Sequence, residues 1–337
     1  MQNTSYNIEP ILDKVRRVLK THQLDRPGAY ARWIWQDERG GRQLGVNPYG
    51  CADAANILYT IGEFPSGEAE RRSWVDTLQG LQNPETGEYT EATHCMLHTT
   101  AHCIAALELF DQRPRHPLRT LEPYLKRENL LQLLESLRWV DSPWDNSHKG
   151  AGVFVALVLS GMADFRWKQW YFDWFYEQAD PETGFWRKGC LDRPESLPLF
   201  HHMAGSFHYL FNHESERMPL RYPDRMVDSC LELSTGLLPP YFGRTAGFLE
   251  VDWVYCLNRA WRQSGHRTQE ARQALCQFAR QYYDYLMDVD EETDEGFNDL
   301  HMLFGTVCAL AELQQSVYGL YRSAAPLRLV LDRRPFI

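Results

Sequence analysis

Hydrophobic and polar positions follow two patterns along the chain. Some segments carry apolar residues on one face only, as residues 9–24 do, and this spacing is typical of an amphipathic helix. Other segments are apolar on almost every side and rich in small residues, as residues 96–110 are. A helix that is apolar all round must be surrounded by protein. The sequence therefore predicts an inner layer of helices covered by an outer one.

The two kinds of segment alternate along the whole chain. Amphipathic helices are predicted over 9–24, 67–82, 120–139, 166–178, 222–235 and 268–288, and apolar helices over 51–62, 96–110, 148–164, 201–213, 251–264 and 299–320. The apolar segments recur about every 50 residues, a period typical of repeat architectures. We therefore expect an all-α fold, an α/α toroid of six helical hairpins. Residues 1–337 would form this one domain, with 323–337 as a terminal extension.

The first turns of the apolar segments carry aspartates and histidines. In a closed ring these turns would meet at the mouth of one central cavity, where helix N-termini also offer unpaired N–H groups and positive dipole ends. The candidates are Asp53, His98, His148, His202, Asp252, Asp299 and His301. Polar side chains gathered at a cavity mouth indicate a site for a small molecule or an oligosaccharide.

Two of the aspartates are predicted to act as general acid and base. Apolar neighbours would raise the pKa of one carboxyl group of the pair, which we assign to Asp53 and Asp252. His98, His202 and His301 would then orient or polarise the substrate. The alternative is that the carboxylates only cap their helices, a position that aspartate favours.

Substrate contacts are predicted for further residues of the rim. Loops on the same side carry aromatic rings that could stack on a sugar face or an isoprenoid chain, namely Phe185, Trp186, Tyr241 and Phe248. His148 and Asp299 would add polar contacts.

Two sets of residues could hold a metal ion. One is Glu250, Asp252 and His301 on adjacent hairpins, which could instead form an acid–base pair, and the other lies on a single helix. His94, His98 and His102 are spaced by four, so they share one helical face, and imidazoles at this spacing can chelate zinc. The alternative is that they hydrogen-bond within the rim. His208, two turns into its helix, is expected to be a core histidine.

The composition of the chain limits the classes of partner that the protein is expected to bind. The net charge of −10 over 337 residues argues against nucleic acid, which requires a basic face. No apolar stretch reaches the length of a membrane span. The eight cysteines form no CxxC pair, which favours a reduced, cytoplasmic setting. The oligomeric state is left open.

One turn resembles a motif of protein prenyltransferases and terpenoid cyclases. Gln178-Ala-Asp-Pro-Glu-Thr-Gly-Phe-Trp186 is similar to their Gln…Gly-x-Trp repeat, and Gln82 to Tyr89 is a weaker copy. The resemblance implies an α/α toroid and a divalent metal such as zinc, held at positions matching Glu250, Asp252 and His301. The family's ligand cysteine is missing, and so are the Asp-x-Asp-Asp and Asp-Asp-x-x-Asp motifs of the cyclases.

The same turn also resembles one in six-hairpin glycosidases, including enzymes that act on unsaturated uronides. That resemblance implies aspartates at inner-helix ends, although the Trp-x-Arg-Gly-x-Gly-Trp signature is absent. We favour an enzyme that hydrolyses, cleaves by elimination or epimerises a carbohydrate or uronide, because desolvating histidines and carboxylates against a hydrocarbon is costly. The alternatives are a metal-dependent prenyltransferase-like or cyclase-like enzyme and a non-catalytic binding protein.

Overall fold

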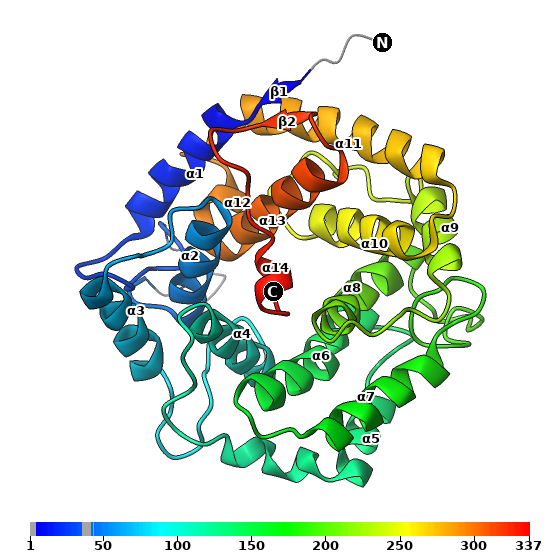
Figure 1. Ribbon diagram of the computed structural model, residues 1–337, viewed down its shortest axis with the longest axis horizontal. Helices are drawn as coiled ribbons and strands as arrows, with labels where there is room; N and C mark the ends of the chain where they lie inside the picture. Colours follow the sequence, from blue (N-terminus) through cyan, green and yellow to red (C-terminus); the bar gives the residue numbers. More distant parts are fainter. Residues whose placement is uncertain (1–4, 36–41, 43) are drawn as a thin grey trace.

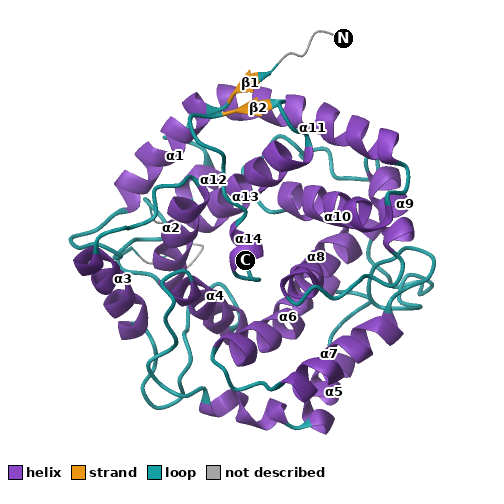
Figure 2. Cartoon of the chain, in the orientation of Figure 1, coloured by secondary structure: helices purple, strands orange, loops and turns teal. Residues whose placement is uncertain are grey.

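The computed structural model describes residues 5–35, 42 and 44–337. Six long inner helices are α2 (Pro48–Thr60), α4 (Met96–Glu108), α6 (Pro143–Leu159), α8 (Leu199–Ser215), α10 (Leu249–Ser264) and α13 (Leu300–Ser316). The outer helices are α1 (Glu9–His22), α3 (Glu68–Gly80), α5 (Arg127–Ser136), α7 (Phe165–Gln178), α9 (Pro223–Leu233) and α11 (Thr268–Asp288). The prediction of a helical chain is confirmed (Figure 2).

The inner helices form a closed ring. Each packs against the next in chain order, and α13 returns to pack against α2 (Figure 1). Helix α4 buries eleven of its thirteen residues, including His98 and His102, as expected for a helix with protein on all sides. Outer helices bury one face only: in α11 the buried positions include Ala271, Leu275, Phe278 and Tyr282, which follow the period of an amphipathic helix.

Several helix boundaries differ from the sequence prediction. Residues 120–139 were expected to form one helix, but a 3₁₀ segment (Arg119–Leu125) containing Pro123 precedes α5. Helices α2 and α6 begin earlier than predicted, with Pro48 and Pro143 in their first turns, where proline is well tolerated.

These earlier starts change the role of one aspartate. The cap of α2 is Asn47, whose side chain accepts from the backbone N–H groups of Tyr49 and Gly50. Asp53 therefore lies in the second turn and does not cap its helix. Asp252 does not cap α10 either, because Phe248 occupies the cap position. Asp299 does cap α13, accepting from the backbone of His301.

The repeated Pro-Glu-Thr-Gly turn has a structural role in both copies. Asn83 and Asp180 each accept two backbone N–H groups within their turn. Gly87 and Gly184 adopt positive φ angles of 83° and 76°. A Cβ on Gly87 would lie 2.0 Å from the carbonyl oxygen of Pro117, so only glycine fits.

The end of the chain enters the ring. After β2 (Tyr321–Arg322), which pairs in parallel with β1 (Tyr6–Asn7), residues 323–337 run to the centre, where the short helix α14 (Val330–Arg333) lies (Figure 1). The backbone of Arg328 donates to Thr60, the last residue of α2. Arg333 likewise pairs with Glu108, the last residue of α4. The tail therefore enters from the end of the ring formed by the C-termini of the inner helices.

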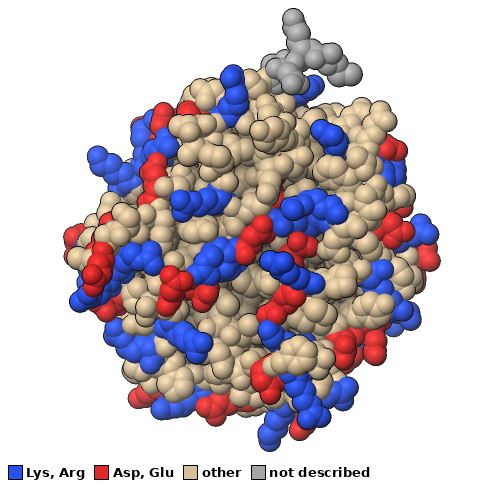
Figure 3. Space-filling model, viewed as in Figure 1, with Lys and Arg blue, Asp and Glu red and all other residues tan. Residues whose placement is uncertain are grey.

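The outer surface mixes charges of both signs. Figure 3 shows basic and acidic side chains interspersed over the face viewed. Within the part of the chain that the structure describes, every helix is too short or too polar to cross a bilayer. A further short helix, α12 (Glu295–Asn298), precedes α13.

Candidate active site

A cavity of about 210 Å³ lies inside the ring. Its lining residues come from five inner helices or the residues just before them, and from the tail: His94, His98, Trp144, Asp145, His148, His208, Phe248, His301 and Ile337. His98, Trp144, Asp145 and His301 belong to the first turns of their helices and Phe248 caps α10, so the cavity opens at the N-terminal end of the ring. The tail, entering from the opposite end, closes its floor. The predicted convergence of inner-helix N-termini therefore holds for His98, His148 and His301.

Asp53 joins two histidines beside this cavity. Its Oδ1 lies 2.7 Å from Nε2 of His102 and 3.2 Å from Nδ1 of His301. All three side chains are buried. An ionised carboxylate only accepts hydrogen bonds, so both imidazoles donate to it. Nε2 of His301 then carries the lone pair on the side of the ring away from Asp53.

A second group contains three histidines and no carboxylate. His98, His148 and His208 each bring one ring nitrogen within 4.8 Å of the other two. Nδ1 of His98 is hydrogen-bonded to the Tyr49 hydroxyl. Nδ1 of His208 lies 2.9 Å from the Ser147 hydroxyl. In both rings Nε2 is the nitrogen left available.

Burial makes these histidines neutral at pH 7. Desolvation lowers the pKa of His98, His148 and His301 well below 6.5, and the neighbouring imidazoles lower it further. The pKa of His208 is lowered to about 3 by desolvation. Burial also lowers the pKa of His102, although Asp53 opposes that shift. The site thus offers lone pairs and N–H groups rather than positive charge.

Tyr49 and Arg32 support the histidines from the side. The Tyr49 ring stacks on His94 and His102, with centroids 4.5 and 5.0 Å away. The Arg32 guanidinium lies 4.8 Å from the centre of the Tyr49 ring and makes two hydrogen bonds to Asp299, at 2.8 and 2.9 Å. Asp299, predicted as a substrate contact, is therefore held by an internal ion pair.

The predicted chelate of His94, His98 and His102 is not assembled. These residues follow one face as expected, but His98 joins His148 and His208, whereas His102 joins Asp53. His94 stacks on Tyr49 and His98 without belonging to either group. Side chains from the neighbouring helices determine which histidines come together. The spacing of histidines along one helix does not predict this grouping.

The metal set implied by the prenyltransferase resemblance does not fit either. Among the described residues, Glu250, Asp252 and His301 do not bring ligand atoms within 4.8 Å of one another. Glu250 accepts from the Gly243 backbone and from Thr245. Asp252 is fully buried, and neither carboxylate oxygen has a hydrogen-bond partner among the described residues. Burial and the charge of Glu250 raise the pKa of Asp252 well above 3.8, which favours its protonated form.

Three other predicted site residues lie away from this cavity. His202 is 1% exposed, and its Nε2 lies 3.0 Å from the Ser196 hydroxyl. Trp186 is 3% exposed and donates to the Phe175 carbonyl, and Phe185 is 1% exposed. Both rings pack among helices instead of facing the cavity, since their loop folds inward over α8.

A wider vestibule of about 470 Å³ adjoins the cavity and shares Trp144 and Phe248 with it. Its lining includes Tyr241, Arg244, Glu250, Asp299 and also Arg42, which pairs with Glu295 at 2.8 Å. Tyr241 is half exposed and Phe248 partly exposed. The predicted stacking residues Tyr241 and Phe248 therefore line a space that a ligand can enter.

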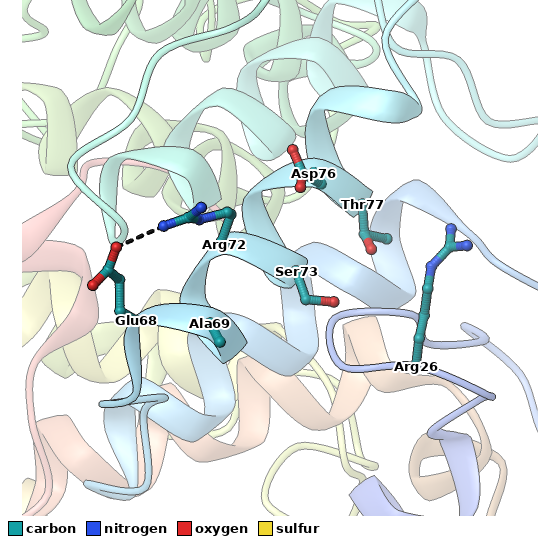
Figure 4. Close-up of a pocket in the computed structure, with 7 residues that line it drawn as sticks. All are labelled: Arg26, Glu68, Ala69, Arg72, Ser73, Asp76 and Thr77. Atoms are coloured by element: carbon teal, nitrogen blue, oxygen red, sulfur yellow. Dashed lines mark hydrogen bonds and ion pairs between the residues drawn. The ribbon is translucent and has the colours of Figure 1, made fainter.

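A larger hollow of about 740 Å³ lies on the outside of the molecule, over α3. Figure 4 shows Glu68 paired with Arg72, beside Asp76 and Arg26. These four side chains are exposed. Because the hollow has no buried titratable group, we place the candidate site inside the ring.

Several members of the site were not predicted from the sequence, among them Trp144, Asp145 and Ile337 of the cavity lining and three further residues. Tyr49 and Arg32 come before the first predicted apolar helix, so they were not among the candidates. His208 was predicted to be a core residue. His208 could have been found from its phase: it lies six residues after His202, about 240° further around the helix. That rotation directs one histidine to Ser196 and the other to the cavity.

No protein-family model matches the chain, and a search among curated proteins finds no relative. The residues themselves therefore carry the functional argument.

Proposed function

We propose that this protein is an enzyme that catalyses general acid–base chemistry on a small polar substrate inside an α/α toroid. The best substrate class is a uronide or a related carbohydrate. The observation that supports this most is the pair formed by Asp53 and His301, in which the carboxylate orients an imidazole that lines a cavity. Asp53 and His301 were expected to take part in catalysis, and here they act as one unit.

His301 is the proton acceptor of this mechanism. Asp53 accepts a hydrogen bond from the Nδ1–H group of His301, which selects the tautomer with a free Nε2, the arrangement used by His–Asp pairs in other enzymes. Burial lowers the pKa of His301 well below 6.5. The ring is therefore in its basic form at neutral pH, ready to take a proton from a substrate in the cavity.

The side chains favour proton abstraction over glycoside hydrolysis. Hydrolysis of a glycosidic bond uses two carboxyl groups that flank the bond, roughly 5–9.5 Å apart. The cavity is lined by histidines and by one exposed carboxylate, Asp145. Asp53 is occupied by His102 and His301, and Asp252 lines neither the cavity nor the vestibule. A lyase or an epimerase fits this set of groups better than a hydrolase does.

The vestibule suits a substrate that carries a carboxylate. Arg244 lines it, is exposed, and forms no ion pair within the described part of the chain. Tyr241 and Phe248 offer aromatic faces to the apolar side of a sugar ring. The volume of about 470 Å³ falls in the usual range for small-molecule sites.

The step can be written for a uronate. Nε2 of His301 takes the proton from the carbon next to the carboxylate, and the electron pair moves onto the carboxyl group, which a guanidinium stabilises. In a lyase the pair then expels the oxygen on the neighbouring carbon, which leaves with the proton that His301 abstracted. In an epimerase the carbon takes a proton from water on its opposite face, and His301 releases its proton to water.

The test is a screen of uronates and oligouronides in deuterated water. We expect deuterium at the abstracted carbon, or a new carbon–carbon double bond seen by ultraviolet absorption. His301→Gln should lower the rate by about 10²–10⁴-fold, as expected for a general base. His202→Gln, a buried histidine outside the cavity, should change it less than threefold. Full activity in His301→Gln, or no exchange with any uronate, would contradict the proposal.

A further inference from the structure

The three-histidine group has an arrangement that the general-base mechanism does not use. One ring nitrogen from each of His98, His148 and His208 lies within 4.8 Å of the others. Within the described residues, no hydrogen bond joins these rings to one another. Their partners are the side chains of Tyr49 and Ser147 and, for His208, also the backbone of Ala204. Three ring nitrogens that are not hydrogen-bonded to one another thus lie close together, on residues that all line the same cavity.

The hydrogen bonds of Ser147 fix the tautomer of His208. The Ser147 hydroxyl has one proton, which it donates to the Trp144 carbonyl. It therefore accepts from Nδ1 of His208, so that Nδ1 carries the proton and Nε2 the lone pair. A metal-bound histidine usually has this arrangement, with its outer N–H held by a second group.

The group that contains Asp53 is arranged differently. There the nearest atoms are already joined, at 2.7 and 3.2 Å, by hydrogen bonds to Oδ1. A cation in that group would have to displace both protons. The three-histidine group needs no such displacement, because a zinc ion 2.1 Å from three nitrogens sets them roughly 3.4 Å apart. Each pair would close by at most about 1.4 Å from the 4.8 Å limit.

We propose that His98, His148 and His208 form a binding site for a divalent transition metal, of which zinc fits best. Three neutral imidazoles are the ligands of several catalytic zinc sites, which keep the fourth position open. Here the fourth position faces the cavity of about 210 Å³. A metal held there supplies a Lewis acid or an activated water to that cavity. Neutral imidazoles also suit copper and nickel, so the test includes competition between metals.

The inference does not depend on the proposed function, because metal binding is measured on the resting protein. The chelator-treated full chain is titrated with zinc sulfate, and bound zinc is measured by mass spectrometry. Cobalt provides a second signal, the visible absorption of a four-coordinate ion. We expect one zinc ion per chain, bound more tightly than nickel. Copper is expected to bind more tightly than zinc, as it normally does with ligands of this kind.

Variants locate the site. His148→Gln and His208→Gln should each weaken zinc binding more than about 100-fold, since even outer-shell changes commonly cost 10–100-fold. His202→Gln, on the same helix, and His102→Gln, in the other group, should stay within threefold. His148 is partly exposed, so His148→Gln gives a result even if His208→Gln does not fold, which circular dichroism will show. Absence of zinc binding, or loss in His102→Gln with retention in His148→Gln, would overturn the proposal.

Discussion

Two groups of histidines lie side by side in the ring, all of them buried except His148, which is partly exposed, and only one group contains a carboxylate. Asp53 accepts a hydrogen bond from His102 and one from His301. His98, His148 and His208 have no carboxylate among them. All five imidazoles have a pKa below the ordinary value because of burial. The comparison shows that burial sets the charge of a histidine, whereas its hydrogen-bond partner sets where its lone pair points.

The same comparison assigns different chemistry to neighbouring residues. A carboxylate holds the outer proton of His301 and leaves a base directed at the cavity. A hydroxyl and a phenol hold the outer nitrogens of His208 and His98, and the inner nitrogens then face one another. We propose that the first group moves protons and that the second holds a cation.

The largest expected effect comes from Asp53→Asn. The neutral amide has lost the negative charge that holds both imidazole N–H groups as hydrogen-bond donors. The tautomer of His301 is therefore no longer fixed. We expect the rate on the uronate found in the screen to fall by roughly 10³–10⁴-fold, as in a His–Asp pair with the same change. Zinc affinity should stay within threefold. If the rate of the variant stays within tenfold of that of the unaltered protein, the carboxylate does not give the two histidine groups different chemistry.

The next effect concerns the free energy of unfolding at acidic pH. His213 serves as the test residue because it is a buried histidine that belongs to neither group. Desolvation lowers its pKa to about 4. Because the folded pKa lies below the unfolded value of about 6.5, its contribution is fully present above that value and is lost as the pH falls. Between pH 7 and pH 5 the loss is about 2 kcal/mol for this residue.

Urea unfolding at pH 7 and pH 5 measures this effect. His213→Gln should make the difference between the two pH values smaller by about 2 kcal/mol. An unchanged difference would mean that burial does not set the charge of this histidine, and the assumption of neutral imidazoles in the cavity would lose its support.

A smaller effect is expected from Ser147→Ala. This variant removes the group that accepts the Nδ1 proton of His208, and outer-shell partners of this kind are worth about 10–100-fold in metal affinity. Ser196→Ala is the matched control, because Ser196 makes the corresponding contact to His202 on the same helix. Equal zinc affinity in the two variants would argue against His208 as a ligand.

The smallest effect contrasts Asp252 with Asp53. Asp252 has no imidazole partner, and burial raises its pKa well above 3.8. The folded state therefore holds this proton more tightly than the unfolded chain, so stability is lost as the pH rises from 3.8 toward the folded pKa. Asp252→Asn should therefore stabilise the protein more at pH 8 than at pH 5, as measured by urea unfolding at the two pH values. A loss of stability at pH 8 would indicate a partner for the ionised carboxylate.

The sequence predicted the helical layers because burial on one face or on all faces is visible in the apolar pattern. The sequence also indicated that His98, His148 and His301 lie near one cavity, because the first turns of the inner helices lie at the same end of the ring. It could not choose between His202 and His208, because that choice depends on the rotation of α8 in the ring. The sequence predicted residues 323–337 as a terminal extension but did not place them inside the ring, because the buried residues Phe336 and Ile337 are separated from their neighbours by long stretches of chain.

The most direct test of the account is a crystal of the zinc-soaked protein measured at the zinc absorption edge. The account predicts one anomalous peak between the ring nitrogens of His98, His148 and His208, with Asp53 still hydrogen-bonded to His102 and His301. A peak at Asp53, or no peak in the ring, would contradict the claim that the carboxylate separates a proton-transfer group from a metal-binding group.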